Sequence, residues 1–415
     1  MTASVCHKRT TCRVCGSDRL YLFLSLGPQP LANAFLSDTN RFGSESRYPL
    51  DVYFCESCSL VQLLDVIDPE VLFREYIYVT GTSETIAAHN VSYARAVVDL
   101  LRLGESDLVV EIASNDGSLL QQFRACGVKT LGIEPARNLA EIARAKGIAT
   151  IDRFFESEVG KCVRGSHGPA RAVIANNVLA HVDETRDFLC GARELIADDG
   201  LVIMEVPYLR DLVNRLEYDT IYHEHLCYFS ATTLARLCEA ADLRLVRIDY
   251  VPVHGGSLRM YAGRREYHPS HSPAVMELLE QERREGLTSR ERYMKFAGEV
   301  AENRRAILDL LEKLSAKRKV IAGYGAPAKG NTLLNYCGIG PDLLPFTVDK
   351  NQMKVGKFTP GTHIPVEPVE RLLERQPDCV LILAWNFAEE IMRQQSAYRT
   401  RGGSFIIPIP SPMVV

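Results

Sequence analysis

Short apolar runs alternate with longer amphipathic stretches in the middle of this chain. The apolar runs lie at residues 107–113, 128–134, 172–175 and 201–206, and each is short enough for one buried strand. The stretches between them have the spacing of helices, and the first begins at Leu119 after a polar turn. Because strands that alternate with helices favour a parallel sheet covered on both faces, this region predicts a doubly wound α/β fold.

A second α/β unit begins nearer the C-terminus. An apolar run at 319–323 is followed by a glycine-containing turn at 324–330 and by a helix start at Asn331. Later apolar runs lie at 344–349, 380–385 and 403–408. Between the two units, residues 273–319 are rich in Glu and Arg and contain no proline after Pro273, which predicts one or two amphipathic helices with a solvated charged face.

These patterns divide the chain into three parts. Its length of 415 residues is typical of about three domains. We predict an α/β protein with an N-terminal zinc-binding module at 1–66, a central Rossmann-like domain at 67–270 and a second Rossmann-like domain at 271–415. A monomer is expected, because three domains already bury much apolar surface against one another.

The composition is that of an ordinary globular protein. Hydrophobic residues make up 46% and charged residues 24%, and the formal net charge is -4. Without a basic balance or a basic stripe, neither nucleic acid nor an anionic membrane is favoured as a partner. No apolar run reaches the roughly 18 residues that span a bilayer, and residues 1–10 lack the apolar core of a signal peptide, so we expect a cytoplasmic protein.

Four of the twelve cysteines have the spacing of metal ligands. Cys12 and Cys15 form one C-x2-C pair, and Cys55 and Cys58 form a second pair after a spacer of 39 residues. Each pair offers two thiolates from one tight turn, which suits tetrahedral Zn²⁺ better than it suits unrelated thiols. Four cysteines leave no open coordination position, so we predict structural zinc that supplies folding free energy to a module with a marginal core.

The first α/β unit has the parts of an adenosine-binding site. Its first strand contains Glu111 and its second ends in Glu134, close to the separation expected for a ribose-binding carboxylate. The turn between them contains only Gly117, which departs from the dinucleotide fingerprint and favours S-adenosylmethionine (SAM) over NAD. The predicted cofactor-binding residues follow the first four strands and are Glu111, Ala113, Ser114, Asn115, Asp116, Glu134, Asp152 and Asn176.

A dense group of proton-transfer residues follows the strand at 201–206. Tyr222, His223, Glu224 and His225 are consecutive, and such side chains are the usual agents of proton transfer near neutral pH. Their place after a strand puts them near the carboxyl end of the sheet, where open α/β folds bind ligands. Acid/base chemistry is one interpretation, and a polar loop with local hydrogen bonds is the other. We leave out His223 because it points away from its neighbours in an extended segment.

Taken together, these motifs resemble those of a known enzyme family. The two cysteine pairs and the segments 111–117, 222–225 and 323–330 are jointly similar to the three-domain sugar C-methyltransferases of antibiotic deoxysugar pathways. The resemblance covers nearly the whole chain. It implies SAM, structural zinc and methylation at C-3 of a TDP-linked 4-keto-deoxysugar, of which a 3-amino-2,3,6-trideoxy sugar is one candidate.

The resemblance also implies an enolate mechanism. A hydrogen on the carbon beside a ketone is acidic because the resulting anion is delocalised onto oxygen, so a His base can generate a carbon nucleophile. We predict His225 as this base, with Glu224 holding its tautomer and Tyr222 donating to the developing oxyanion. Tyr76 and His181 are implied to complete the pocket.

The turn at 323–330 is predicted to bind a diphosphate. It offers backbone N–H groups, Lys329 and a helix N-terminus, but it lacks the Gly-Lys-Ser/Thr of a Walker loop. The resemblance assigns it to the nucleotide end of the substrate. The predicted substrate-binding residues are Asn177, His254, Tyr324, Lys329, Lys350 and Lys357.

Other functions fit parts of the sequence. An NAD(P)-dependent nucleotide-sugar oxidoreductase would bind its dinucleotide at 323–330, with Asp349 on the ribose, but it would leave the first α/β unit without a ligand. A zinc scaffold without catalysis would leave the proton-transfer residues without a purpose. An O- or N-methyltransferase also stays open, because the residues indicate a base and not the acceptor atom.

Overall fold

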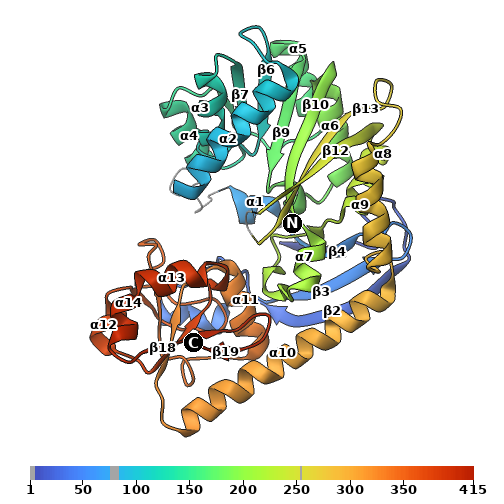
Figure 1. Ribbon diagram of the computed structural model, residues 1–415. Helices are drawn as coiled ribbons and strands as arrows, with labels where there is room; N and C mark the ends of the chain where they lie inside the picture. The colour runs from blue at the N-terminus through green and yellow to red at the C-terminus, as the bar shows by residue number, and fades with distance from the viewer. Residues whose placement is uncertain (1–4, 75–83, 253–254) are drawn as a thin grey trace.

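A computed structural model describes residues 5–74, 84–252 and 255–415 of the chain. Figure 1 shows a central sheet flanked by helices, a smaller α/β unit connected to it through the long helix α10, and an N-terminal β-sheet near both. The predicted α/β fold class, with a cysteine-rich module in front of two α/β units, is confirmed. Among the described residues, no helix is both long and apolar enough to cross a membrane.

The N-terminal module is built from two small sheets. In one, β1 (Cys6–Lys8) pairs antiparallel with β5 (Asp65–Ile67). The other has the order β11-β4-β3-β2 and consists of β2 (Leu20–Gln29), β3 (Tyr48–Cys55), β4 (Val61–Leu63) and β11 (Cys227–Tyr228). Two short helices, η1 (Thr39–Ser44) and α1 (Pro69–Phe73), accompany them. Strand β11 directly follows the proton-transfer residues, so the N-terminal module holds one end of that segment.

The central unit contains a seven-stranded sheet with the order β12-β13-β10-β9-β6-β7-β8. Its strands are β6 (Leu108–Ile112), β7 (Lys129–Ile133), β8 (Thr150–Ile151), β9 (Ala170–Asn176), β10 (Ile196–Pro207), β12 (Leu243–Val251) and β13 (Ser257–Arg264). All run parallel except β13, which is antiparallel to both of its neighbours. The predicted mostly parallel sheet is therefore confirmed, whereas β12 and β13 were not found from the sequence.

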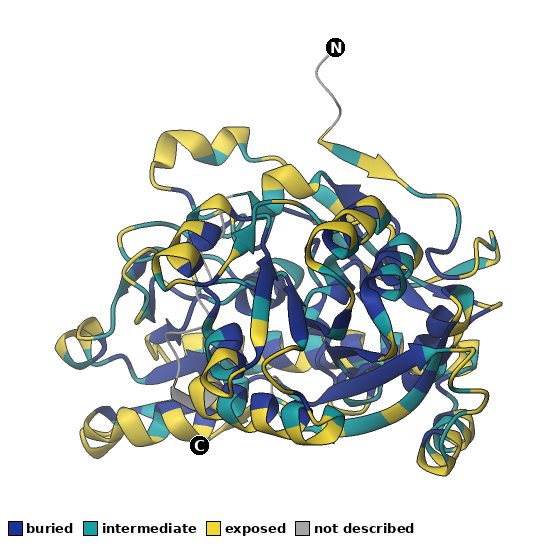
Figure 2. Cartoon of the chain, turned by 90° about the horizontal axis from the view of Figure 1, so that it is seen from above, coloured by how far each residue is buried: buried dark blue, intermediate teal, exposed yellow. Residues whose placement is uncertain are grey.

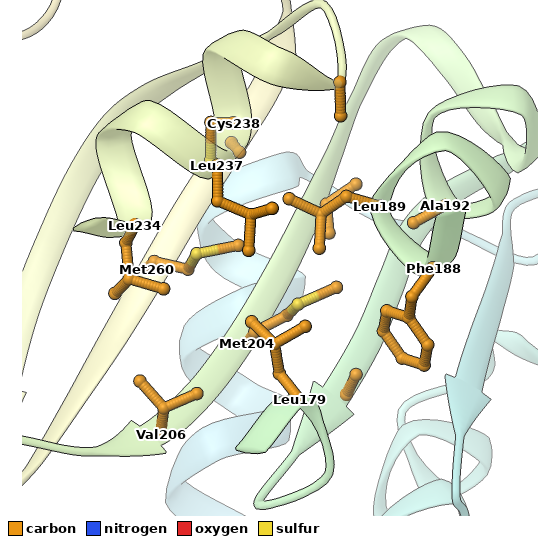
Figure 3. Packing of buried hydrophobic residues seen from close by; sticks show 14 of the residues in the cluster. Leu179, Phe188, Leu189, Ala192, Met204, Val206, Leu234, Leu237, Cys238 and Met260 are labelled. Atoms are coloured by element: carbon orange, nitrogen blue, oxygen red, sulfur yellow. The ribbon is translucent and has the colours of Figure 1, made fainter. Parts of the chain in front are cut away.

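Helices cover both faces of the central sheet (Figure 1). They are α2 (Glu84–Leu101), α3 (Ser118–Ala125), α4 (Arg137–Ala145), α5 (Ser157–His167), α6 (Thr185–Leu195) and α8 (Ala231–Ala240), with the short turn η3 (Leu179–His181). Helix α7 (Leu209–Asn214) and the short turn η4 (Tyr218–Thr220) follow β10 and pack in an apolar cluster with β2 and β3 of the N-terminal module. Figure 3 shows Met204 of the sheet in one apolar cluster with Leu189 of α6 and Leu237 of α8. All three side chains are fully buried, so truncating either leucine to Ala costs about 2–5 kcal/mol.

Two helices, α9 (Pro273–Arg284) and α10 (Arg290–Ala316), lead to the C-terminal unit. Buried residues of α10 recur every three or four positions, at Tyr293, Phe296, Val300, Asn303, Ile307 and Leu311. This spacing keeps one face of the helix against β2 and the C-terminal unit, so the predicted amphipathic pattern is confirmed. Figure 2 shows the same division across the molecule, with buried strands inside and exposed faces on the outer helices.

The C-terminal unit has a six-stranded sheet with the order β16-β15-β14-β17-β18-β19. Its strands are β14 (Ile321–Tyr324), β15 (Thr347–Asp349), β16 (Val366–Pro368), β17 (Cys379–Ile382), β18 (Ser404–Ile407) and β19 (Met413–Val414). Its helices are α11 (Ala328–Cys337), η5 (Trp385–Phe387), α12 (Arg371–Arg375), α13 (Ala388–Gln394) and α14 (Ser396–Thr400). The strand predicted at 344–349 begins only at Thr347, because Pro345 has no N–H group to donate to a neighbouring strand.

Apolar clusters cross the predicted domain boundaries. One cluster joins Cys12 and Cys58 of the N-terminal module to Val110 of the central sheet. Another joins Leu50 of the N-terminal module, Ile221 of the proton-transfer segment and Leu333 of α11. The three parts thus share apolar cores, and their division at residues 66 and 270 stays a prediction.

Candidate active site and zinc site

One cavity of about 1110 Å³ lies where the central unit meets the C-terminal unit. Its wall includes Ala113, Glu134 and Asn177, near the carboxyl ends of central strands, and Lys329 in the first turn of α11. This volume exceeds the roughly 300–1,000 Å³ of a typical small-molecule site. The cavity therefore has room for two ligands.

The turn after β6 forms the predicted cofactor end of this cavity. Ala113 and Asn115 adopt left-handed backbone conformations, with φ of +54° and +51°. The N–H of Asn115 donates to one carboxylate oxygen of Glu134 at 2.7 Å, and the N–H of Ala136 donates to the other at 2.8 Å. Residues held in such conformations concentrate at functional sites, and here the Glu134 carboxylate fixes the shape of the turn.

Buried acidic groups in this wall fit a polar ligand. Burial raises the pKa of Glu134 to about 7. Burial and the nearby charges of Glu134 and Asp116 raise the pKa of Glu111 well above its ordinary value. Within the described part of the chain, Glu111 Oε2 and Ser114 Oγ have no hydrogen-bond partner, although both residues line the cavity. Because buried polar atoms are normally paired, these atoms suit a nucleoside such as that of SAM.

Two of the predicted cofactor-binding residues, Asp116 and Asp152, lie outside the cavity wall as the structure describes it. Asp116 pairs with Lys146 at 2.5 Å and accepts a hydrogen bond from Ser118 Oγ at 2.7 Å, so it stabilises the start of α3. Asp152 lies 3.4 Å from Arg74. Each carboxylate faces a cation, and the direct contact of Asp116 and Asp152 with the cofactor stays a prediction. Glu111, Ala113, Ser114, Asn115, Glu134 and Asn176 do line the cavity.

The structure brings His225 and Tyr222 together in the cavity wall. His225 Nδ1 lies 2.8 Å from the carbonyl oxygen of Thr220, which can only accept a hydrogen bond, so Nδ1 carries the proton. Nε2 is then the unprotonated nitrogen, and the Tyr222 hydroxyl donates to it at 2.9 Å. A neutral imidazole with an unprotonated Nε2, in a ring that lines the cavity, is the form that a general base needs.

His181, also predicted, lies beside this pair. Its ring centroid is 4.9 Å from that of His225, and it also lines the cavity. Burial and the proximity of His181 lower the pKa of His225 to about 3. Burial lowers the pKa of His181 to about 4. Both rings are therefore neutral near pH 7, because the buried site disfavours two adjacent cations.

Glu224 is placed differently from the prediction. Its Oε1 accepts a hydrogen bond from Asn33 Nδ2 of the N-terminal module at 2.7 Å. The carbonyl of Thr220, rather than Glu224, holds the tautomer of His225. Glu224 instead ties the proton-transfer segment to the N-terminal module. His223 points away, as predicted, with Nε2 at 3.2 Å and 3.1 Å from the carbonyl oxygens of Tyr48 and Pro49.

Two predicted residues, Tyr76 and His254, lie outside the described residues. Asn177, predicted to bind substrate, lines the cavity and has a left-handed φ of +54°. It directly follows β9 as Ala113 directly follows β6, so two neighbouring parallel strands are each followed by a residue with a left-handed backbone conformation. This edge of the sheet is where ligands bind in open α/β folds.

Only part of the predicted nucleotide end faces the cavity. Lys329 lines it, contacts Asn386 and lies 4.3 Å from the centroid of the Trp385 ring. Tyr324, Lys350 and Lys357 are not among the described residues of the wall. Tyr324 is buried beneath the sheet edge, and Lys350 pairs with Gln394 on the surface. Substrate contacts of these three residues stay predictions, and the described wall of the cavity does not include them.

Two residues at or near this site, Lys354 and Glu205, were not predicted from the sequence. Lys354, outside the described wall of the cavity, contacts the glycine-containing turn, where its Nζ donates to the carbonyl of Ala326 at 2.8 Å. Glu205 at the end of β10 lines the cavity between His89, 3.2 Å away, and Arg259. Glu205 could have been found from the sequence, because it is an acidic residue near the end of an apolar run, as Glu111 is. Nothing in the sequence around Lys354 distinguishes it from the other lysines.

The predicted zinc ligands are close enough to share one ion. The four sulfur atoms of Cys12, Cys15, Cys55 and Cys58 all lie within 4.8 Å of one another. Cys12 and Cys58 sulfurs are 3.4 Å apart, and Cys15 and Cys55 sulfurs are 3.6 Å apart. Tetrahedral Zn²⁺ with bonds of about 2.3 Å spaces its sulfur ligands roughly 3.8 Å apart. The donor set therefore fits structural zinc.

Comparisons with known proteins agree with this arrangement. Three family models match in succession: "Putative zinc binding domain" at 12–73, "Methyltransferase domain" at 87–248 and "C-methyltransferase C-terminal domain" at 252–410. They define the class of the protein as a zinc-containing methyltransferase. C-methyltransferase NovU from Streptomyces niveus is 40% identical over 404 residues, covering 97% of this chain and 96% of that protein. The chain belongs to the family of SAM-dependent C-methyltransferases.

Solved methyltransferase structures resemble part of the chain. The match to magnesium protoporphyrin IX methyltransferase from Synechocystis PCC 6803 with bound SAM covers 44% of this chain and 82% of that chain, with 15% identity and a TM-score of 0.33. The match to mitomycin 7-O-methyltransferase covers 43% of this chain and 54% of that chain, with 18% identity and a TM-score of 0.33. The oxidoreductase alternative finds no support among the comparisons.

Proposed function

We propose that this enzyme transfers a methyl group from SAM to C-3 of a TDP-linked 4-keto-deoxysugar. The observation that carries the proposal is the pair of polar atoms in the cavity wall, Tyr222 Oη and His225 Nε2, 2.9 Å apart. His225 Nε2 can accept a proton from carbon, while Tyr222 Oη can donate a hydrogen bond to oxygen. Two such groups side by side match the hydrogen on C-3 and the carbonyl oxygen on C-4, which are on adjacent carbons.

Different residues of this chain have separate roles in forming the enolate. His225 Nε2 takes the C-3 proton and becomes the cation, while the Thr220 carbonyl keeps the ring in place through Nδ1. The Tyr222 hydroxyl turns from Nε2 to the C-4 oxygen as that oxygen gains negative charge. Bound SAM supplies an electrophilic methyl group, which the carbon nucleophile requires. Glu134, Glu111 and Ser114 are the side chains that would hold its nucleoside end.

The C-terminal unit is proposed to hold the nucleotide end of the sugar. Lys329 is the basic residue of the wall on this side, and it lies at the first turn of α11, where the backbone also favours anions. A 3-amino-2,3,6-trideoxy sugar remains one proposed substrate of this class. Antibiotic deoxysugar biosynthesis is the proposed context, supported by the likeness to NovU.

Product analysis tests this proposal. The enzyme is incubated with isotope-labelled SAM and a panel of TDP-4-keto-deoxysugars with hydroxyl or amino groups at C-3, and the methylated position is read by NMR. The proposal expects one new methyl group on C-3. Methyl transfer to oxygen or nitrogen of the same sugars would contradict it.

Glu134→Ala is expected to weaken SAM binding about 10- to 100-fold. The substitution removes the carboxylate that can accept the ribose hydroxyls, and it releases the N–H groups of Asn115 and Ala136 that shape the turn. Isothermal titration with SAM measures the affinity. The matched control is Glu141→Ala, an exposed acidic residue of the neighbouring helix α4, which should leave SAM affinity unchanged. Equal affinities of the Glu134 variant and the wild type would remove Glu134 from the cofactor site.

A further inference from the structure

The segment that carries His225 rests against the C-terminal unit through a small set of buried contacts. Asp219 in η4 is fully buried, and its Oδ2 accepts a hydrogen bond from Trp385 Nε1 at 2.6 Å. Two residues further on, the carbonyl of Ile221 accepts from Thr332 Oγ1 of α11 at 3.2 Å. These contacts lie on either side of Thr220. The C-terminal unit therefore fixes the backbone on both sides of the carbonyl that binds His225.

The position of Thr220 decides the state of His225. Its carbonyl oxygen accepts the Nδ1 proton at 2.8 Å and thereby leaves Nε2 unprotonated toward the cavity. If η4 rotates, this carbonyl turns with it, and the imidazole loses both its orientation and its preferred tautomer. A misplacement of about 1 Å at a reacting group can lower a rate 100-fold.

Trp385 also contacts the proposed nucleotide end. Lys329 Nζ lies 4.3 Å from the centroid of the Trp385 ring and bonds to the adjacent Asn386. Lys329 lines the cavity, and the Trp385 indole N–H donates to Asp219, whose charge lies close enough to Lys329 to favour its cationic form. A half-buried indole N–H usually has an acceptor, and Asp219 provides it. The Trp385 side chain thus contacts both Lys329 in the cavity wall and Asp219 in the turn that positions His225.

We infer that Trp385 and Asp219 are positioning residues, which hold Thr220 and through it aim His225 at the substrate. The inference rests on the proposed function, because His225 is the base only in that proposal. Neither residue carries a proton in the reaction. The C-terminal unit then serves catalysis directly, in addition to holding the nucleotide end.

Paired substitutions test this inference. Trp385→Phe keeps an aromatic ring beside Lys329 but removes the N–H, and Asp219→Leu removes the acceptor. Both are expected to lower kcat about 100-fold, with the KM for the sugar nucleotide and the affinity for SAM changed only a few-fold. Asp219→Asn keeps an oxygen acceptor for the indole and should restore most of the activity. Arg47→Met removes a different contact between parts of the chain, to the Gly361 carbonyl at 3.0 Å, and should leave kcat unchanged.

A second readout needs no substrate. Nitrogen NMR of the folded enzyme at neutral pH, with the His225 signal assigned by its loss in His225→Asn, reports which ring nitrogen carries the proton. The wild type should show the Nδ1–H form, and Trp385→Phe and Asp219→Leu should show a mixture of both forms. Trp385 is the single tryptophan of the chain, so a red-shifted emission in Asp219→Leu reports the broken contact directly.

The outcomes separate this inference from the proposed function. An unchanged His225 tautomer, or a loss of kcat that only matches the loss of folded protein, would overturn the positioning role. A wild-type enzyme that methylates no 4-keto sugar would instead contradict the proposed function, while the tautomer comparison would still decide whether Trp385 and Asp219 hold Thr220.

Discussion

Replacing His225 with Asn is expected to lower turnover about 100- to 10,000-fold, the usual contribution of a general base. Asn can still accept a hydrogen bond from Tyr222, but it cannot take a proton from carbon. SAM affinity should be unchanged, because the predicted cofactor end of the cavity lies around Glu134 and not at this ring. Steady-state kinetics with a TDP-4-keto-deoxysugar and titration with SAM measure the two quantities separately.

The neighbouring His223 provides the matched control. It belongs to the same segment, but its Nε2 faces the carbonyl oxygens of Tyr48 and Pro49 in the N-terminal module. His223→Gln keeps a donor for these carbonyls and should retain most of the turnover. Near-normal turnover in His225→Asn would show that another group removes the proton.

Loss of zinc is expected to inactivate the enzyme by unfolding its N-terminal module. Structural zinc stabilises small zinc-binding units by about 10–16 kcal/mol at neutral pH, more than most domains have in total stability. The damage should reach the active site because β4 of this module pairs with β11, and Asn33 binds Glu224. Cys58→Ser should therefore reduce the zinc content, the thermal midpoint and the turnover together.

Metal analysis, circular dichroism and activity on the same preparations measure these three changes. Cys162→Ser is the control, because Cys162 is exposed on α5 and outside the cysteine cluster. It should keep full zinc content and turnover. A Cys58→Ser enzyme that lacks zinc yet melts and turns over as the wild type does would show that the metal has no structural role.

Features that are local in the chain could be predicted from the sequence. The cysteine pairs, the turn after β6 and the Tyr222–His225 cluster are each encoded within a few residues, and the structure brings the last two to one cavity. Strands β6, β9 and β10 followed from apolar runs of the right length, because strands buried on both faces are mostly apolar. Strand β13 contains Arg259 and an Arg at its end, which obscured its apolar pattern.

Features that depend on distant contacts could not be predicted. The partner of His225 Nδ1 is a main-chain carbonyl, which any residue type at position 220 would provide. Glu224 was expected beside His225 because it is adjacent in sequence, but its partner is Asn33, 191 positions away. Likewise, Lys350 and Lys357 were predicted from the sequence, but the path of the loop brings Lys354 to the glycine-containing turn.

Hydrogen exchange at the sugar tests the central claim most directly. The enzyme is mixed with a TDP-4-keto-deoxysugar in heavy water without SAM, and deuterium at C-3 is followed by NMR and mass spectrometry before SAM is added. We expect enzyme-dependent deuterium at C-3, slowed in His225→Asn, and a methyl group at the same carbon once SAM is present. No exchange at C-3, together with no methyl gain on any of several such sugars, would contradict it.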